Sequence, residues 1–397
     1  MSFQPTARPQ RRALLRSVLL RTALWGALVG AALGDPRAAA AQQIGEEFHY
    51  HDSGNVVQLV TEEGKLITEA AVGASEGDIY ITGENDQYIV RRVEGNRAFV
   101  EYQGKAEMPD VTEVLRAMER AAQEGAGSAR AGRSGLVEWL LSAAGRSRGA
   151  DVGIYHTHNA ESYRPTSGVE FKERGDIHEV GRKLKEEFEK RGLTVEWSEN
   201  SHLPHDGQAY LRSRRTAAQL SRKRPATIID VHRDAIPRPD EYRTEVNGTP
   251  MTQVRLVVGR QNQNREANLE YAKQIKAIAD EKYPGLIKGI YHARGNYNQD
   301  LGPRMMLLEF GSHVTGLEEA LRSVPPIADV IAAAAGLVPG TDGGGRVGSA
   351  GARTAVWILV IAAIAGAGWI LLNKEGLGGL KRLLGKGPQD GGDSGQE

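Results

Sequence analysis

Short runs of alternating apolar and polar side chains fill residues 55–105, and turn residues separate the runs. Alternation with a period of two is typical of strands that are buried on one face only. The pattern predicts strands at 55–60, 78–82, 87–93 and 98–102. Gly, Asn and Glu residues occupy the intervening turns. We therefore expect a small β domain over residues 42–105.

Strand and helix patterns alternate beyond residue 150. Apolar runs of strand length occupy 152–155, 194–197, 227–231, 253–258 and 305–310. Runs with helical spacing fall between or after them, at 178–191, 208–223, 265–282 and 317–335. This alternation favours an α/β fold, and we predict a largely parallel sheet with helices on both faces over residues 151–336. Such sheets bind ligands beyond the carboxyl ends of their strands.

The segments that flank this predicted domain have simpler compositions. Residues 106–150 read as a helical linker region, with a helix at 111–124 and a Gly/Ser/Arg-rich stretch after it. Residues 337–353 form a Gly-rich tether. The tether contains Gly343-x-Gly345-x-x-Gly348, but no strand precedes these glycines, so we do not interpret them as a dinucleotide-binding motif.

Both ends of the chain carry targeting signals. Residues 1–41 combine a basic start, an apolar run and a small-residue cleavage site, which indicates a signal peptide or signal anchor. Residues 354–372 carry no charge and are long enough for a transmembrane helix. Residues 373–397 form a basic, low-complexity tail, and the positive-inside rule places this tail in the cytoplasm. We therefore expect a cell-membrane protein whose two predicted domains, at 42–105 and 151–336, are extracytoplasmic.

Composition excludes several classes of chemistry. The chain has 50 basic and 50 acidic residues, which gives no indication of a nucleic-acid partner. It has no cysteine, so disulfides, thiolate metal sites and cysteine nucleophiles are excluded.

Two histidines and a carboxylate follow the strand predicted at 152–155. The sequence His156-Thr-His158-x-x-Glu161 places them within one turn. Imidazole and carboxylate groups bind Zn²⁺ at about 2.0–2.2 Å, and a catalytic zinc ion has three protein ligands and one open position. We favour His158 with Glu161 as ligands and keep His156 as the alternative histidine.

A third ligand and a base come from two later strands. The strand at 227–231 runs directly into His232, and the apolar run 305–308 leads into Glu309. A charged residue in such an apolar run is costly to bury unless a specific interaction uses it. His158, His232 and Glu309 should therefore meet at one edge of the sheet.

These residues predict metal-assisted hydrolysis of an amide. Zinc lowers the pKa of its bound water to about 7, and Glu309 would accept the proton of that water. Asp230 or Asp234 could orient His232 by accepting its second N–H, although an ordinary solvated or capping role explains them equally well.

Four motifs together resemble the stage II sporulation protein P family. They are His156-Thr-His158-x-x-Glu161-Ser-Tyr163, Asp230-x-His232-Arg233-Asp234, Gly295-Asn296-Tyr297-Asn298-Gln299-Asp300 and Leu308-Glu309-x-Gly311. The resemblance covers residues 150–336 and, less specifically, the strands before them. It implies an exported, membrane-anchored peptidoglycan hydrolase of endospore-forming bacteria.

The resemblance also implies an activity, a cofactor and partners. The expected enzyme is a zinc-dependent N-acetylmuramoyl-L-alanine amidase that also has a peptide-crosslink endopeptidase activity and thins the septal wall during engulfment. The expected partners are the lytic transglycosylase called stage II sporulation protein D and the membrane protein called stage II sporulation protein M.

The resemblance leaves several residue roles open. The wider amidases take their carboxylate ligand from the following helix, where this chain offers Glu179, but Glu161 belongs to the motif of this family and is preferred. Arg233 lies within the second motif. The segment before the Glu309 strand offers polar groups for glycan or peptide, and a tight turn explains this segment equally well; its polar residues are Asn296, Tyr297, Asn298, Gln299 and Arg304.

Two other functions fit parts of the pattern. His158-x-x-Glu161 with a distant histidine and glutamate also suits a zinc carboxypeptidase-like peptidase. A catalytically dead scaffold that binds cell wall is the third hypothesis, but it predicts missing ligands, and the sequence lacks none.

Overall fold

The computed structural model describes residues 56–127 and 150–338 of the 397-residue chain. The predicted leader, residues 128–149 of the linker, nearly all of the tether, the span at 354–372 and the tail lie outside these residues. Within the described ranges, no helix is long and apolar enough to cross a membrane.

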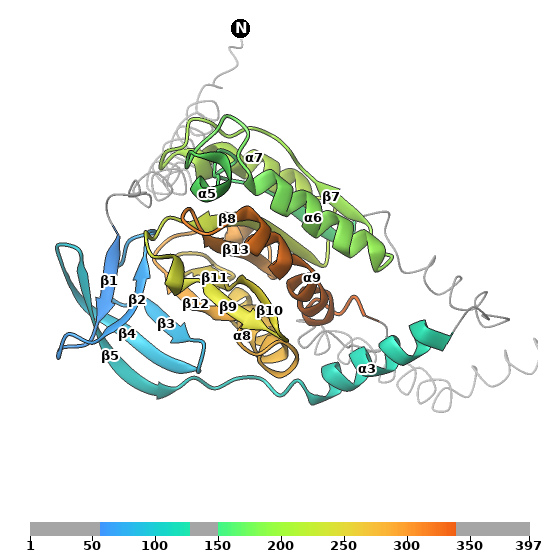
Figure 1. Cartoon of the computed structure of the whole chain (residues 1–397), viewed down its shortest axis with the longest axis horizontal. Coiled ribbons are helices and arrows are strands. Elements are labelled where there is room, and N and C mark those ends of the chain that lie inside the picture. The colour runs from blue at the N-terminus through green and yellow to red at the C-terminus, as the bar shows by residue number, and fades with distance from the viewer. Residues whose placement is uncertain (1–55, 128–149, 339–397) are drawn as a thin grey trace, which may run out of the picture. The chain divides into compact units, whose positions relative to one another are not determined.

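The described residues contain one sheet of eleven strands (Figure 1). Their order across the sheet is β2-β1-β5-β4-β3-β12-β11-β13-β8-β6-β7. The strands are β1 (Val57–Val60), β2 (Leu66–Ala70), β3 (Ile79–Thr82), β4 (Asp86–Glu94), β5 (Arg97–Lys105), β6 (Val152–Tyr155), β7 (Val195–Trp197), β8 (Thr227–Asp234), β11 (Val254–Gly259), β12 (Ile287–Ala293) and β13 (Met305–Ser312). The α/β class predicted from the sequence is confirmed.

The prediction of a largely parallel sheet is wrong, because the sheet is mixed. Strands β7, β6, β8 and β13 run parallel to one another, but β11 pairs with β13 in the antiparallel direction. No α-helix connects β8 to β11; the connection holds a short 3-10 helix, η1 (Pro239–Glu241), and the hairpin of β9 (Arg243–Val246) and β10 (Thr249–Thr252). A parallel neighbour would require a crossover that brings the chain back to the edge of the sheet where β8 begins. The hairpin does not do this, so β11 starts near the edge where β8 ends and runs antiparallel to β13.

The N-terminal strands do not form a sheet of their own, although the sequence led us to expect a small β domain. Strand β3 pairs with β12 in antiparallel register, from Thr82 opposite Gly289 to Ile79 opposite His292. Strand β12 was not predicted, and it is the strand that joins the two halves. Residues 57–105 therefore extend the sheet that carries the candidate site.

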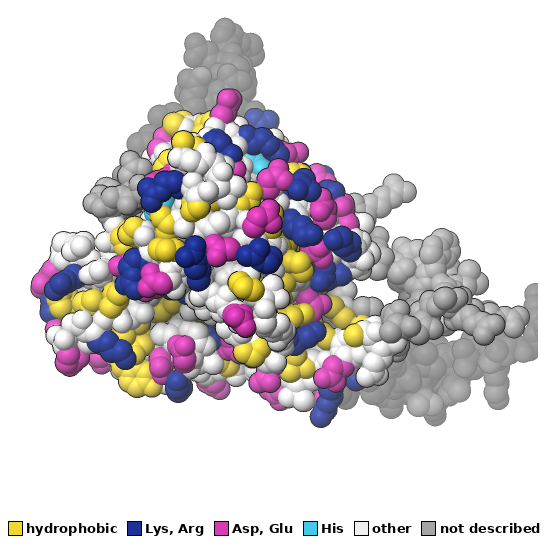
Figure 2. All heavy atoms as spheres, viewed as in Figure 1, with side chains coloured by type: hydrophobic (Ala, Val, Ile, Leu, Met, Phe, Trp, Pro, Cys, Tyr) yellow, Lys and Arg dark blue, Asp and Glu magenta, His cyan; other side chains and the backbone are white. Residues whose placement is uncertain are grey.

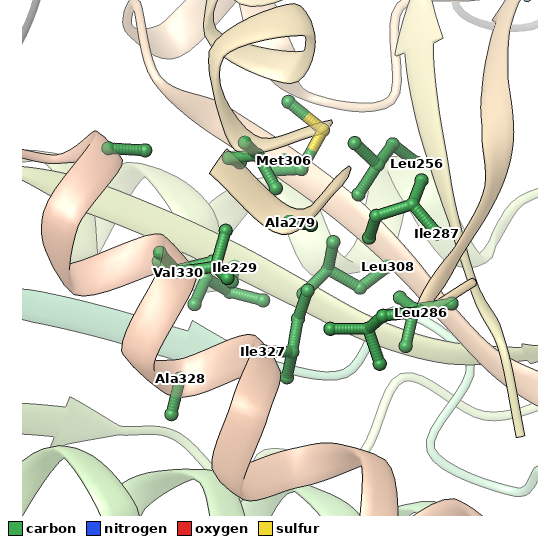
Figure 3. Close-up of a cluster of buried hydrophobic side chains, with 14 of the residues drawn as sticks. Ile229, Leu256, Ala279, Leu286, Ile287, Met306, Leu308, Ile327, Ala328 and Val330 are labelled. Carbon is green, nitrogen blue, oxygen red and sulfur yellow. The ribbon is translucent and has the colours of Figure 1, made fainter. Parts of the chain in front are cut away.

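Helices cover both faces of the sheet, as predicted. Helices α6 (Ile177–Lys190), α8 (Arg265–Lys282) and α9 (Leu317–Ala334) pack on one face, in the largest buried apolar cluster. Figure 3 shows part of this cluster, in which Ile327 and Val330 of α9 lie beside Ile229 and Leu308 of the sheet. Helix α7 (Ala209–Ser221) packs on the opposite face, against Ile228 and Met305. The amphipathic helix α3 (Thr112–Gly127) adds Val114 and Met118 to the first cluster.

Strand alternation decides which residues face which helices. In β8, Ile229 and Val231 join the α6–α9 cluster, whereas Ile228 joins the α7 cluster. Successive side chains of a strand point to opposite faces. Asp230 and His232 therefore lie on the α7 face, and this parity sets the geometry of the site.

The described surface carries a mixture of charges. Figure 2 shows Lys and Arg side chains interspersed with Asp and Glu on the face in view, with little histidine surface. Most of the described histidines are buried, including His156, His158 and His232.

Candidate metal centre and active site

The carboxyl ends of β6 and β8 bring three metal-ligating side chains together. His158, Glu161 and His232 each offer one ligand atom, and these atoms all lie within 4.8 Å of one another. Glu161 Oε1 lies 3.4 Å from His158 Nδ1 and 3.5 Å from His232 Nδ1. The sequence predicted this meeting at one sheet edge, and the structure has it.

The distances within this group match the size of a zinc site. Two ligands at about 2.0–2.2 Å from a tetrahedral centre are separated by roughly 3.3–3.6 Å. The two contacts of Glu161 Oε1 fall within that range. Two imidazoles and one carboxylate are also a donor set that suits zinc and leaves a fourth position open. The residues present therefore fit the predicted metal.

A tight loop after β6 presents His158 and Glu161. The N–H of Glu161 donates to the carbonyl of His158 at 3.2 Å, and Glu161 forms an isolated β-bridge with Phe171. The backbone N–H of Arg233 donates to Glu161 Oε2 at 2.9 Å. The Arg233 guanidinium is buried and donates to the carbonyls of Ser162, Asp234 and Glu170. Arg233 thus fixes the loop and leaves Glu161 Oε1 facing the histidines.

The Asp230 carboxylate lies against the His232 ring. Its Oδ1 lies 2.9 Å from His232 Nε2 and accepts the backbone N–H of Thr157 at 2.8 Å. Nδ1 of His232 is therefore the nitrogen that faces Glu161.

Charge favours a cation at this position. Burial alone would lower the pKa of His232, but the carboxylates of Asp230 and Glu161 outweigh it and raise the pKa to about 10. Burial likewise opposes ionisation of Glu161, yet His232 and His158 hold its pKa well below the usual value. Two buried carboxylates thus attract positive charge to one point, and a divalent metal supplies such a charge.

Glu309 lies opposite His232 on the adjacent parallel strand, where the two residues are Cα partners. It is buried, and its Oε2 lies 3.1 Å from the Tyr242 hydroxyl oxygen and 3.6 Å from the Arg255 guanidinium. Burial and the charge of Asp234 raise the pKa of Glu309 to about 8. A carboxyl with such a pKa both accepts and returns a proton near neutral pH.

A bulge follows Glu309 at the end of β13. Register with β8 shifts between Glu309 and Ser312, and Gly311 adopts φ 67°. A Cβ at Gly311 would lie 2.5 Å from Thr315 Oγ1 and 2.7 Å from Thr252 Cγ2, so only glycine fits. The bulge beside the candidate base thus explains why the fourth motif has a glycine at position 311.

His156, the alternative histidine, is held away from this group. His156 is two residues after Ile154, and alternate residues of a strand point to the same face. Its ring therefore lies with Ile154 on the α6 side of the sheet, whereas His232 lies on the α7 side. Its Nε2 accepts the Trp197 indole N–H at 3.1 Å, and its Nδ1 lies 3.2 Å from the Val231 carbonyl oxygen. A Cβ at Gly181 of α6 would lie 2.4 Å from the ring. Burial, with His178 nearby, lowers the pKa of His156 to about 3.

Glu179, the alternative carboxylate, does not lie at the site. It is in the first turn of α6 and pairs with Arg182 at 2.7 Å, with 44% of its side chain exposed. The geometry therefore assembles Glu161, and not Glu179, with the two histidines.

The Asp234 side chain bonds a tyrosine and an arginine beside Glu309. Its Oδ2 accepts the hydroxyl of Tyr242 at 2.8 Å and Arg255 Nη1 at 2.6 Å. It acts on Glu309 by its charge and through these two shared partners.

The segment before β13 is a structural turn. Tyr297 and Asn298 have φ values of 52° and 58°, and Gln299 donates its N–H to the carbonyl of Asn296 at 2.9 Å. The Asn298 amide donates to the carbonyl of Tyr210, and the Gln299 side chain bonds the backbone of β11. The alternative interpretation as a tight turn accounts for these contacts.

Arg304 lies at the opposite end of β13 from Glu309. Its guanidinium donates to the carbonyl of Ala335, and its own carbonyl accepts the N–H of Ile228 at the start of β8. Arg304 therefore does not contribute to the site.

The site has walls that the sequence did not indicate. The Tyr210 ring lies 5.2 Å from the His158 ring and 6.2 Å from the His232 ring, and the His205 ring lies 4.5 Å from His158, between centroids. The space between the candidate residues is about the size of one water molecule. Its lining is Ala71, Val72, His158, Glu161, Tyr210, His232, Arg233, Asp234, Ala235, Leu307 and Glu309.

Arg255 and Tyr242 were also missed. Arg255 interrupts the apolar strand sequence Val254-Arg255-Leu256-Val257, the same signal that identified Glu309. Tyr242 lies in a connection without any strand or motif signal, so the sequence offered nothing by which to find it.

Comparison with known proteins gives one family match. Residues 57–332 match the sequence profile of the family described as Stage II sporulation protein P. The Stage II sporulation protein P of Bacillus subtilis (strain 168) is 35% identical over 199 residues, which make up 45% of this chain and 49% of that protein. The chain therefore spans about half the length of this curated relative.

Two solved structures show a partial likeness. One is the CwlD amidase from Clostridioides difficile in complex with the GerS lipoprotein, with 13% identity, 46% of this chain and 95% of that chain covered, and a TM-score of 0.31. The other is an N-acetylmuramoyl-L-alanine amidase from Clostridium difficile 630, with 13% identity, 48% and 96% covered, and a TM-score of 0.31.

Proposed function

Because the chain belongs to the stage II sporulation protein P family, we propose that it is a peptidoglycan hydrolase of sporulation that cleaves the amide between N-acetylmuramic acid and L-alanine. The observation that carries the proposal is the spacing of Glu161 Oε1 from the Nδ1 atoms of His158 and His232, with Glu309 across the strand pair. A cleavage of peptide crosslinks at the same site extends the proposal.

The proposed cofactor is a zinc ion held by His158 Nδ1, Glu161 Oε1 and His232 Nδ1. Bound there, zinc would supply a Lewis acid and lower the pKa of a water molecule to about 7. Asp230 keeps the His232 ring oriented by its contact with Nε2, and the N–H of Arg233 keeps the Glu161 carboxylate in place.

Glu309 is the proposed general base and acid. Both contacts of its carboxylate engage Oε2, from the Tyr242 hydroxyl and the Arg255 guanidinium. We therefore assign proton transfer to Oε1. The carboxylate takes the proton of the attacking water and returns it to the leaving amide nitrogen, and a pKa near 8 suits both transfers.

The test is mass spectrometry of muropeptides released from purified sacculi by the full chain, with and without a chelator. The amidase proposal expects free lactyl groups on muramic acid and free N-terminal L-alanine. Both products should disappear with the chelator and return when zinc is added. The matched control variant is Glu179→Gln, which changes an exposed carboxylate outside the site.

Other products would assign another function. Released C-terminal amino acids with intact muramyl amides would make the protein a carboxypeptidase-like peptidase. Cut crosslinks alone would leave only the endopeptidase activity. Binding to sacculi without any zinc-dependent release would contradict hydrolysis and leave the scaffold.

The proposed location is the outer side of a membrane, with the tail at 373–397 in the cytoplasm. The targeting patterns at 1–41 and 354–372 support it. The lytic transglycosylase and the membrane protein that the family resemblance implies are proposed partners on the same grounds.

A further inference from the structure

Arg255 is a buried charge at the centre of the sheet, with 1% of its surface exposed. Its Nη1 lies 2.6 Å from Asp234 Oδ2 and 3.6 Å from Glu309 Oε2. Its guanidinium carbon also lies over the rings of Tyr242 and Tyr80, at 5.4 Å and 5.9 Å from their centroids. One side of the guanidinium thus faces the carboxylates of the candidate active site.

The other side of the Arg255 guanidinium is held by the edge strand β2. Nη2 donates to the carbonyl of Glu69 at 2.8 Å and to the Thr68 hydroxyl at 3.0 Å. In sequence, Thr68 and Arg255 are 187 residues apart, and on the sheet order β2 is the outermost strand. Arg255 therefore links the N-terminal strands directly to Glu309.

The chain beyond β2 continues into the site. Ala71 and Val72 line the same small space as His158, His232 and Glu309. The Tyr291 hydroxyl donates to the carbonyl of Gly73 at 2.8 Å and anchors this stretch on β12. The N-terminal strands thus contribute a wall of the pocket as well as two acceptors for Arg255.

We propose that Arg255 is a positioning residue for Glu309, and that strand β2 holds Arg255 in the position that this requires. The inference rests on the proposed function, because it assigns Glu309 as the general base. It gives the N-terminal strands a part in the reaction.

The chemistry of the guanidinium supports this assignment. Its N–H groups are fixed in one plane, so the groups that bind Nη2 also determine where Nη1 lies. If β2 no longer bound Nη2, the guanidinium could rotate, and the Glu309 carboxylate would lose the cation that fixes Oε2. A displacement of about 1 Å at a reacting group can reduce turnover about 100-fold.

The first experiment compares Thr68→Val with Gln58→Leu in the full chain. Valine keeps the shape of threonine and removes the hydroxyl, which accepts from Nη2 and itself donates to the Glu69 carbonyl at 3.3 Å. Gln58 donates to Glu69 Oε1 at 3.1 Å, so Gln58→Leu also removes one hydrogen bond to β2 but none to Arg255. With a soluble muropeptide, Thr68→Val should lower kcat roughly fivefold with little change in KM, and Gln58→Leu should leave kcat unchanged.

The second experiment is a double-mutant cycle with Arg255→Lys. Lysine keeps the charge but cannot bind the carboxylates and the acceptors on β2 at the same time. We therefore expect kcat to fall about 100-fold while the zinc content stays the same. Thr68→Val should cause no further loss in the Arg255→Lys background, because both changes act through the same guanidinium.

Three outcomes would overturn the inference while leaving the proposed function intact. These are wild-type turnover in Thr68→Val, an equal loss of kcat in Gln58→Leu, and additive losses in the double variant. A wild-type chain that releases no muropeptides would contradict the proposed function itself. If Arg255→Lys does not fold, as judged by thermal unfolding, the comparison of Thr68→Val with Gln58→Leu decides.

Discussion

His232 and Glu309 occupy opposing positions on two adjacent parallel strands, β8 and β13, and are paired in register. Residues in register on neighbouring strands point to the same face. The proposed ligand and the proposed base therefore share a face because the backbone pairing requires it. Glu309 is also contacted by two groups outside these strands, Tyr242 and Arg255.

Glu309→Gln tests the assigned base. Glutamine keeps the size of the side chain but cannot take up a proton at neutral pH. We expect release of muropeptides to fall about 10²- to 10⁴-fold with zinc content unchanged, measured by mass spectrometry and metal analysis on the same sample. Residual activity near the wild-type level would exclude Glu309 as the base.

His158→Ala and His156→Ala form a matched pair. His158→Ala removes a ligand atom, so the protein should lose its stoichiometric zinc. His156→Ala removes the acceptor of the Trp197 indole on the other side of the sheet, so we expect zinc to remain and the free energy of unfolding to fall by about 1–3 kcal/mol. Zinc content and urea unfolding of the two variants distinguish the roles. Loss of zinc in His156→Ala alone would reverse the assignment.

The raised pKa of Glu309 predicts a pH dependence of stability in the metal-free protein. Its folded pKa of about 8 lies above the ordinary value of 4.5. The protonated carboxyl thus stabilises the fold fully below pH 4.5, and this contribution is lost as the pH rises to about 8. With a chelator present, the wild type should lose stability relative to Glu309→Gln over this range. A difference in unfolding free energy between the two proteins that stays the same at pH 5, 6.5 and 8, measured by urea unfolding, would contradict the raised pKa of Glu309.

The absence of cysteine permits a clean test of membrane orientation. Glu63→Cys places a thiol on an exposed turn of the described part, and Ser394→Cys places one in the tail. We expect a membrane-impermeant maleimide to label intact cells only at position 63. Both positions should react after the cells are opened. Labelling of position 394 in intact cells would reverse the proposed orientation.

Sequence patterns were sufficient to predict the group of candidate ligands that the structure brings together, because each of them follows or ends an apolar run. His232 and Glu309 interrupt such runs, and His158 with Glu161 follows one within a turn. Parity could also have separated His156 from His232, since His156 continues the alternation of Ile154 and lies on the other face. The choice between Glu161 and Glu179 needed the structure, because it depends on how the loop folds back onto Arg233.

Strand direction and the extent of the sheet could not be predicted in this way. Strand β12 has the sequence Ile287-Lys-Gly-Ile-Tyr-His-Ala293, in which Lys288, Gly289 and His292 break the apolar run. Strand β2 contains Thr68 and Glu69, whose burial comes from pairing and from Arg255 rather than from an apolar pattern. Because β12 could not be predicted, the pairing that joins the N-terminal strands to the rest of the sheet could not be predicted either.

The pairing of β3 with β12 has a practical consequence for dissecting the protein. A fragment that starts after residue 150 would contain every proposed ligand and the base. It would also leave the edge of β12 bare, from Gly289 to His292, where β3 normally pairs. Unpaired strand edges recruit other chains, so this fragment should self-associate and precipitate. The solubility of the proposed catalytic part therefore depends on strand β3, which begins at Ile79, far ahead of the first proposed ligand, His158.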